Sequence, residues 1–212
     1  MEIETLLSLD PNLRNSQWEQ DLIKVLPKIN FRLLDEQPQF GPDGFPYMFV
    51  EVGSADHTEP FVNLLEWVAG RGIGIAVNPQ KTMPDYVFSY GMIWYWVLNG
   101  YLNFDSPNSV PGQIVFENGT GLHSGDPSDE YLPKFVRQIL REFLQQNQVD
   151  NPKILVLSSD QNHYDLCFSL DSFGHPPQQE HKDILEALGW FLPNHYSLML
   201  LNEDGLPKFF DL

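Results

Sequence analysis

The sequence has little of what secreted and membrane proteins need. It contains a single cysteine, Cys167, so no internal disulfide can form, which favours a reducing compartment inside the cell. Its longest apolar stretch, residues 91–98, is far shorter than the ~20 residues that span a bilayer. Residues 1–10 include Glu2 and Glu4 and only a short apolar pair, unlike a signal peptide. We therefore expect a cytoplasmic protein without a membrane partner.

Basic residues are also scarce. The chain has 12 Lys and Arg against 29 Asp and Glu, which gives a formal net charge of −17. This charge repels phosphate backbones and anionic lipid surfaces, so nucleic acid is not an expected partner. An acidic surface suits a basic protein partner instead, because complementary charge favours association.

Motifs that would identify a reaction are missing as well. The sequence has no Gly-x-Ser-x-Gly nucleophile turn, no phosphate-binding loop with its lysine, and no Cys or His spacing typical of a metal site. We therefore predict no cofactor and no metal, and we favour a binding or adaptor protein over an enzyme. With 212 residues, 42% of them apolar, the chain can bury one large core or two smaller ones.

The apolar pattern predicts an α+β fold with two similar halves. Each half has the order helix, strand, strand, helix, strand, strand (αββαββ), with mainly antiparallel sheets, as a pseudo-duplicated unit. The expected boundaries are 1–105 for the N-terminal half, 106–125 for a connecting loop and 126–212 for the C-terminal half. This element order resembles the fold of the type III secretion chaperones, which are also small and acidic; the resemblance transfers no residue roles.

Helix starts and stops follow from local signals. Ser16 and Glu19 have capping-box spacing, and Asp126 followed by Pro127 is typical of a helix start. The expected helices are residues 16–26, 56–69, 126–144 and 178–188. The expected strands are residues 31–34, 47–52, 73–77, 85–96, 114–116, 153–158, 164–170, 196–201 and 208–211.

The segment 85–96 concentrates aromatic side chains more than any other. As a strand it would place Tyr90 and Trp94 on one face and Tyr95 on the other. One face must pack on helices, and an open second face would suit a protein partner. Tyr90, Trp94 and Tyr95 are therefore the candidate binding residues. The alternative is that both faces are buried and the segment is core.

A second candidate site lies around Glu51 and His57. Together with Asp56 and Glu59, these residues could bind a cation or act as acid and base. Helix-start preference explains Asp56 and Glu59 without a ligand. Glu51 lacks such a reason, although a salt bridge to a nearby Arg would supply one.

His163, Asp165 and Cys167 alternate along a predicted strand and would share one face. Residues two apart on a strand diverge, so the spacing argues against a catalytic triad and favours packing, with Cys167 filling a small space on a half-solvated face. The alternative function is a small hydrolase-like enzyme. Its site would lie in a cleft between the halves, near Glu51 and His57 or near His163 and Cys167.

Overall fold

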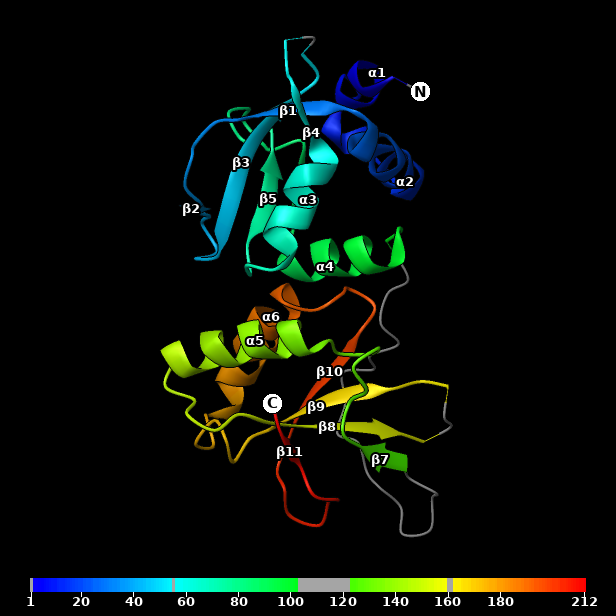
Figure 1. The fold of residues 1–212 in the computed structure, drawn as a ribbon. Coiled ribbons are helices and arrows are strands. Elements are labelled where there is room, and N and C mark those ends of the chain that lie inside the picture. The colour runs from blue at the N-terminus through cyan, green and yellow to red at the C-terminus, as the bar shows by residue number, and fades with distance from the viewer. Residues whose placement is uncertain (1, 55, 103–122, 160–161) are drawn as a thin grey trace. The chain divides into compact units, whose positions relative to one another are not determined.

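A computed structural model describes residues 2–54, 56–102, 123–159 and 162–212 of the chain. These residues form a mixed fold of α-helices and two mainly antiparallel sheets, divided into two compact units, Met1–Phe104 and Asp105–Leu212. Figure 1 shows that each unit has its own sheet and its own helices. Among the described helices, none has the length and apolar character that crossing a membrane requires.

The sheet of the first unit is built around β3 (Pro46–Val52). On one side β3 pairs antiparallel with β1 (Asn30–Leu33), which in turn pairs with β4 (Glu59–Pro60). On the other side it runs parallel to β5 (Gly74–Val77), whose far edge pairs antiparallel with β6 (Tyr86–Phe88). The two-residue β2 (Gln39–Phe40) pairs with the start of β3. The parallel pair needs a crossover, which α3 (Phe61–Ala69) supplies.

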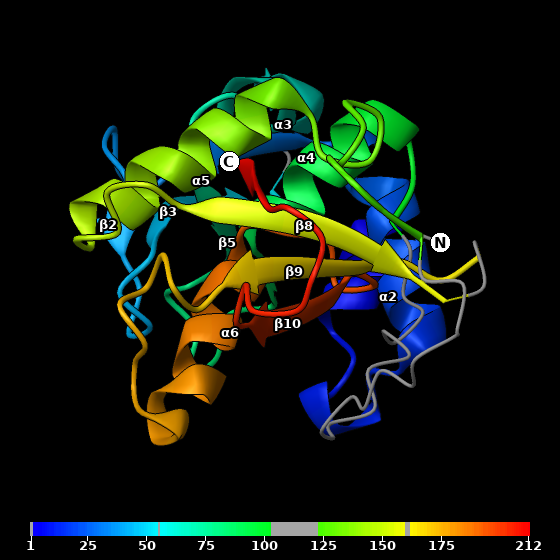
Figure 2. The ribbon, with the colours of Figure 1, turned by 90° about the horizontal axis from the view of Figure 1, so that it is seen from below.

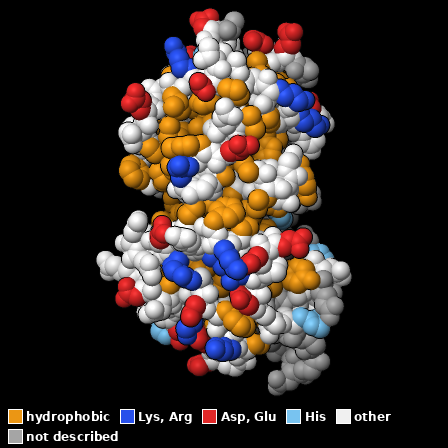
Figure 3. All heavy atoms as spheres, viewed as in Figure 1, with side chains coloured by type: hydrophobic (Ala, Val, Ile, Leu, Met, Phe, Trp, Pro, Cys, Tyr) orange, Lys and Arg blue, Asp and Glu red, His pale blue; other side chains and the backbone are white. Residues whose placement is uncertain are grey.

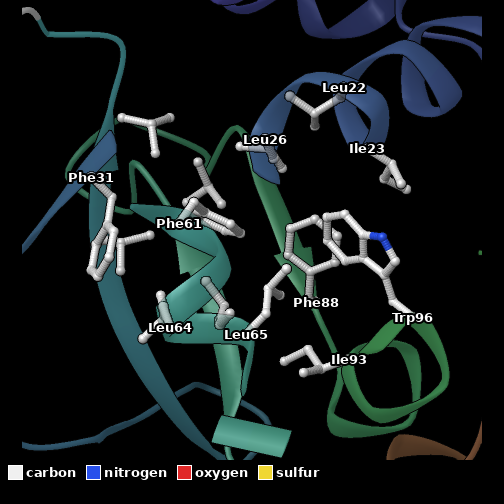
Figure 4. Close-up of a cluster of buried hydrophobic side chains, with 14 of the residues drawn as sticks. Leu22, Ile23, Leu26, Phe31, Phe61, Leu64, Leu65, Phe88, Ile93 and Trp96 are labelled. Carbon is white, nitrogen blue, oxygen red and sulfur yellow. The ribbon is translucent and has the colours of Figure 1, made fainter. Parts of the chain in front are cut away.

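One face of this sheet carries the core of the unit. Met48, Val50 and Val52 of β3 point toward the helices and belong to one buried cluster. From α3, Phe61 packs edge-on against Phe31 of β1, with ring centroids 6.0 Å apart. Figure 4 shows these side chains meeting others from α2 (Ser16–Val25) and from the segment that follows β6. The inward face of α3 consists of Phe61, Leu64, Leu65 and Val68, as the helical spacing predicts.

The N-terminal segment folds as short helical pieces against the same core. The pieces are α1 (Ile3–Leu7), the 3-10 turn η1 (Pro11–Leu13), α2 and the 3-10 turn η2 (Leu26–Lys28). The cap of α2 is Asn15, whose side-chain oxygen accepts a hydrogen bond from the Trp18 backbone N–H at 3.0 Å. The predicted helix is confirmed, with its cap one residue earlier than Ser16.

The predicted strand at 85–96 is wrong. Only Tyr86–Phe88 is strand, and α4 (Tyr90–Asn99) follows it. Ser89 caps α4 by accepting from the Met92 N–H, and Gly100 ends it with φ +75°, a left-handed conformation that glycine adopts without strain. Met92, Ile93 and Trp96 belong to the core cluster, and that spacing is helical. A short apolar run is compatible with both periods, and here the packing on α3 decides for the helix.

The sheet of the second unit is built around β8 (Lys153–Ser158). β8 pairs antiparallel with β9 (Asp165–Ser169), and α6 (His181–Trp190), entered through η3 (Gln178–Glu180), leads to β10 (Ser197–Leu201). β10 runs parallel to β9, while β11 (Phe210–Asp211) and β7 (His123–Gly125) both pair antiparallel with β8. Figure 2 shows the C-terminal segment, in red, crossing in front of β8 and β9.

The helix expected from Asp126 begins later than predicted. It is α5 (Lys134–Gln146), and residues 126–133 approach it without being α-helical. Its N-cap is Pro133 rather than Asp126, whose carboxylate accepts a hydrogen bond from Arg137 at 2.9 Å. The buried face of α5 consists of Val136, Leu140 and Leu144. Similarly, the helix expected from Asp56 begins only at Phe61, because Glu59 and Pro60 form β4.

The two units share part of their topology. In each, a helix precedes an antiparallel strand pair, and a crossover helix leads to a strand parallel to the second member of that pair. The last strand differs: β6 lies beside β5, whereas β11 lies beside β8 at the opposite side of its sheet. The two halves therefore differ in the position of their last strand. The pseudo-duplication stays a prediction.

Most of the expected connecting loop, with the strand at 114–116, lies outside the described residues. Its last residues are described, and they form β7 rather than loop.

Candidate protein-binding surface

The aromatic residues chosen from the sequence lie on α4 in the first unit. Tyr90 and Trp94 are buried, and the Tyr90 hydroxyl donates a hydrogen bond to the Ala69 carbonyl at 2.8 Å. Tyr95 is half-buried, with its ring edge-on to Trp94 and to Tyr101. Of the three, only Tyr95 retains surface that a partner could contact.

Glu51 and His57 are brought together, as the sequence suggested. Glu51 pairs across the strands with Arg32, and its carboxylate forms an ion pair with the Arg32 guanidinium. His57 Nε2 lies 3.5 Å from the same carboxylate, and Gln80 donates to it at 3.4 Å. The salt bridge to an Arg considered from the sequence is therefore present.

The geometry of this cluster suits structure better than catalysis. A general base must present a nitrogen that a substrate proton can reach. His57 is buried, its Nε2 faces Glu51, and its Nδ1 is enclosed without a hydrogen-bond partner among the described residues. Its backbone carbonyl also accepts from the Asn30 side chain at 2.9 Å. His57 therefore fastens the segment before α3 to β1 and β3.

A buried charged network that the sequence did not reveal lies at the ends of β3 and β5. The Asp85 carboxylate is enclosed and accepts hydrogen bonds from Arg14 at 2.8 Å, Asn78 at 2.7 Å and Lys81. Burial alone would raise the pKa of Asp85, but the three donors outweigh it and hold that pKa below the ordinary value of 3.8. Arg14 also stacks over the Trp18 ring at 4.5 Å. All groups are satisfied, so the network clamps the N-terminal segment to the sheet.

Cys167 in the second unit is a packing residue. It is fully buried with Leu155, Leu157 and Phe209, beneath the C-terminal segment. The expected half-solvated face is therefore covered here. Burial, with a smaller contribution from Asp165, raises the pKa of the thiol far above its usual range, so the reactive thiolate does not form at neutral pH. His163 lies before β9 and is exposed.

We expect Cys167→Ala to lower the free energy of unfolding by about 1–2 kcal/mol, because it removes one small buried group. Urea unfolding of the purified variant measures this change. Partner binding should stay at the wild-type level, and loss of binding with unchanged stability would contradict the packing role.

A depression of about 540 Å³ lies on α5 in the second unit, beside Asp211 and Leu212. Its lining is mainly charged, whereas small-molecule sites are mainly apolar. Two of its cations are already paired, Lys134 with Asp129 at 3.1 Å and Arg137 with Asp126 at 2.9 Å. Within the described ranges, no group of His, Cys, Asp and Glu could hold a metal ion.

An exposed apolar surface on the first unit has the character of a binding site. Leu33 pairs with Val50 and Phe40 with Pro46, so both side chains lie on the sheet face that α3 covers. Trp67 lies on α3, three residues after the buried Leu64. The exposed fractions are 41% for Leu33, 76% for Phe40 and 42% for Trp67. We call Leu33, Phe40 and Trp67 the edge patch. Figure 3 shows apolar side chains gathering over α3 and the neighbouring strands.

Trp67 is held in place by Arg71, one helical turn later. The Arg71 guanidinium lies over the indole ring at 4.3 Å and donates to the Trp67 carbonyl at 2.5 Å. A stacked cation restricts the ring, which lowers the entropy lost when a partner covers it. Trp and Arg are also the residues most enriched among interface hot spots. The sequence carried a signal for Trp67, since it lies off the inward stripe of a predicted helix.

Comparison of the chain with known proteins found no matching family model, no similar curated protein and no similar solved structure.

Proposed function

We propose that this chain is a non-catalytic binding or adaptor protein, and that its edge patch docks a protein partner. This proposal rests on the exposed Leu33 and Phe40 on the sheet face that α3 covers, and on the exposed Trp67 on α3 itself. Exposing large apolar side chains to water costs free energy, and large exposed apolar groups are typical of interaction sites. The paired Glu51, enclosed His57 and buried Cys167 give no comparable support to an enzyme.

The partner we propose is basic. Residues 1–104 include 13 Asp and Glu against 6 Lys and Arg, a net charge of −7. Near the patch, Glu66 on α3 and Asp35 and Glu36 after β1 are exposed, whereas Arg71 is occupied by Trp67. A partner that places an apolar side chain on Trp67 and basic side chains around it matches both features. The single buried thiol supports placing this interaction in the cytoplasm.

Phe40→Asp should abolish capture of the partner without unfolding the protein, because Phe40 is mostly exposed on a two-residue strand. Immobilised wild-type and variant protein, exposed to lysate of the native organism, would be compared by quantitative mass spectrometry. We expect at least one basic protein retained by wild type and depleted about tenfold or more by the variant.

Met83→Asp is the matched control, since Met83 is 65% exposed outside the edge patch. It adds the same charge and should leave capture unchanged. If no protein distinguishes Phe40→Asp from Met83→Asp, the edge patch is not the docking site.

A further inference from the structure

Strand β10 in the second unit has an open edge. It is the terminal strand of its sheet, in the order β10-β9-β8-β11, and pairs only with β9 among the described strands. Its five residues, Ser-Leu-Met-Leu-Leu, are uncharged, and all are partly exposed. An uncharged edge of this length offers a ready template for another strand.

The hydrogen-bonding groups that face outward can be assigned. The Leu201 carbonyl accepts from the Leu170 N–H at 2.8 Å, so the backbone of Leu201 faces β9. In a parallel ladder, alternate residues face the same neighbour, so the backbone groups of Leu198 and Leu200 face away from β9. Their side chains lie on the face of Leu166 and Phe168, and Leu198 lies 3.9 Å from a Cβ built on Gly189 of α6. The outer edge of β10 therefore presents the backbone N–H and C=O groups of Leu198 and Leu200, whose side chains pack against the sheet face and α6.

The other edge strands within the described residues are protected by being short. β4 and β11 have two residues, and β6 and β7 have three. β4 also contains Pro60, which has no N–H to donate. Proteins shorten exposed edges to avoid unwanted strand pairing, so a five-residue edge without proline, charge or bulge calls for an occupant. We propose that β10 binds an extended, basic peptide segment of another protein, which adds to the sheet as a further strand.

Acidic residues near β10 favour a basic peptide as the added strand. Beyond its C-terminal end lie Asp171, Glu203 and Asp204, where Asp171 accepts from the Glu203 N–H at 2.9 Å. Glu203 is paired with Lys153 at 3.0 Å and accepts from the Ser169 hydroxyl at 2.7 Å, and Asp171 lies 3.4 Å from His175 Nε2. Asp204 is exposed. A basic residue of the added strand placed beyond Leu201 would meet this acidic end. A second copy of the chain fits less well, because two chains of charge −17 repel each other.

This site is independent of the edge patch, since it lies in the other unit and uses backbone pairing. Its probe is the acetylated and amidated peptide KKVTVTV, whose core favours strands, compared with EEVTVTV. NMR hydrogen exchange on the full chain should show the Leu198 and Leu200 amides exchanging at least about tenfold more slowly when KKVTVTV is bound. EEVTVTV should bind at least about tenfold more weakly.

Leu200→Pro removes one outward N–H, and Leu200→Ala removes the same side chain but keeps that N–H. We expect affinity for KKVTVTV to fall at least about tenfold with Pro relative to Ala. Asp204→Lys, a surface change that leaves the strand intact, should weaken binding of KKVTVTV and strengthen that of EEVTVTV. Three results would each overturn the proposal. They are unchanged exchange of the Leu198 and Leu200 amides on adding KKVTVTV, equal affinity for the two peptides, and a dimer that protects β10 without peptide.

Discussion

Asp85→Ala should lower the free energy of unfolding of the first unit by about 3–5 kcal/mol. Removing one partner of an enclosed ion pair leaves the other charge uncompensated. Here Arg14 and Lys81 lose a shared carboxylate, and Asn78 loses the acceptor of its side-chain N–H. Urea unfolding followed by tryptophan fluorescence would measure the loss, since Trp18 lies under Arg14. Asp35→Ala, at an exposed site, is the control and should change stability by less than about 0.5 kcal/mol.

The same network makes stability depend on acid pH. The folded state lowers the pKa of Asp85 below 3.8, while the unfolded chain has the ordinary value of about 3.9. The stabilising contribution is therefore fully present above about pH 4 and is lost as the pH falls through the folded pKa. Unfolding measured at pH 7, 5 and 3 should show the gap between wild type and Asp85→Asn narrowing only below about pH 4. A gap that is equal at all three values would contradict the ionised network.

Gly74→Ala should destabilise the first unit by about 3 kcal/mol, through overpacking. A Cβ at this position would lie 2.5 Å from the Tyr47 ring and 2.7 Å from the Phe88 carbonyl oxygen. Tyr47 cannot easily yield, because it is buried and its hydroxyl donates to Asp43 at 2.6 Å. The backbone carbonyl cannot move without disturbing β6.

Gly70→Ala is the matched control, because a Cβ there meets nothing within 4 Å and φ is negative. We expect it to be neutral or slightly stabilising, since alanine reduces the freedom of the unfolded chain. Thermal unfolding of both variants would distinguish the two effects. Equal stability of the two variants would show that Tyr47 does not fill the space above Gly74.

Much of the fold could be predicted from the sequence, because most elements have strong local signals. The bounds of β8 and the inward stripe of α3 follow directly from alternation and helical spacing. The failures arose where tertiary packing decides. The aromatic residues of α4 fit strand and helix periods equally, and the packing of Met92, Ile93 and Trp96 with α3 in the core cluster decides for the helix. The position of β11 beside β8 depends on a long-range choice that local pattern does not encode.

For the candidate site, only contacts between residues of neighbouring elements could be predicted from the sequence. Glu51 with an Arg and a nearby His followed from the sequence, and cross-strand register supplies Arg32 as the partner. The Asp85 network could not be predicted, because Arg14 lies 71 residues from Asp85 in the chain. Exposure also could not be assigned to the aromatic residues. Tyr90 and Trp94 proved buried, while Trp67, outside the inward stripe of α3, carries the exposed apolar surface.

The central claim, docking of a basic partner on the edge patch, is tested most directly by the affinity of the captured partner for Trp67→Ala. Trp67 is the largest side chain of the patch and is not in the core cluster, so its truncation should leave the fold intact. Isothermal titration calorimetry should give a Kd at least about tenfold weaker than wild type for Trp67→Ala and an unchanged Kd for Met83→Asp. Wild-type affinity in Trp67→Ala would contradict the account.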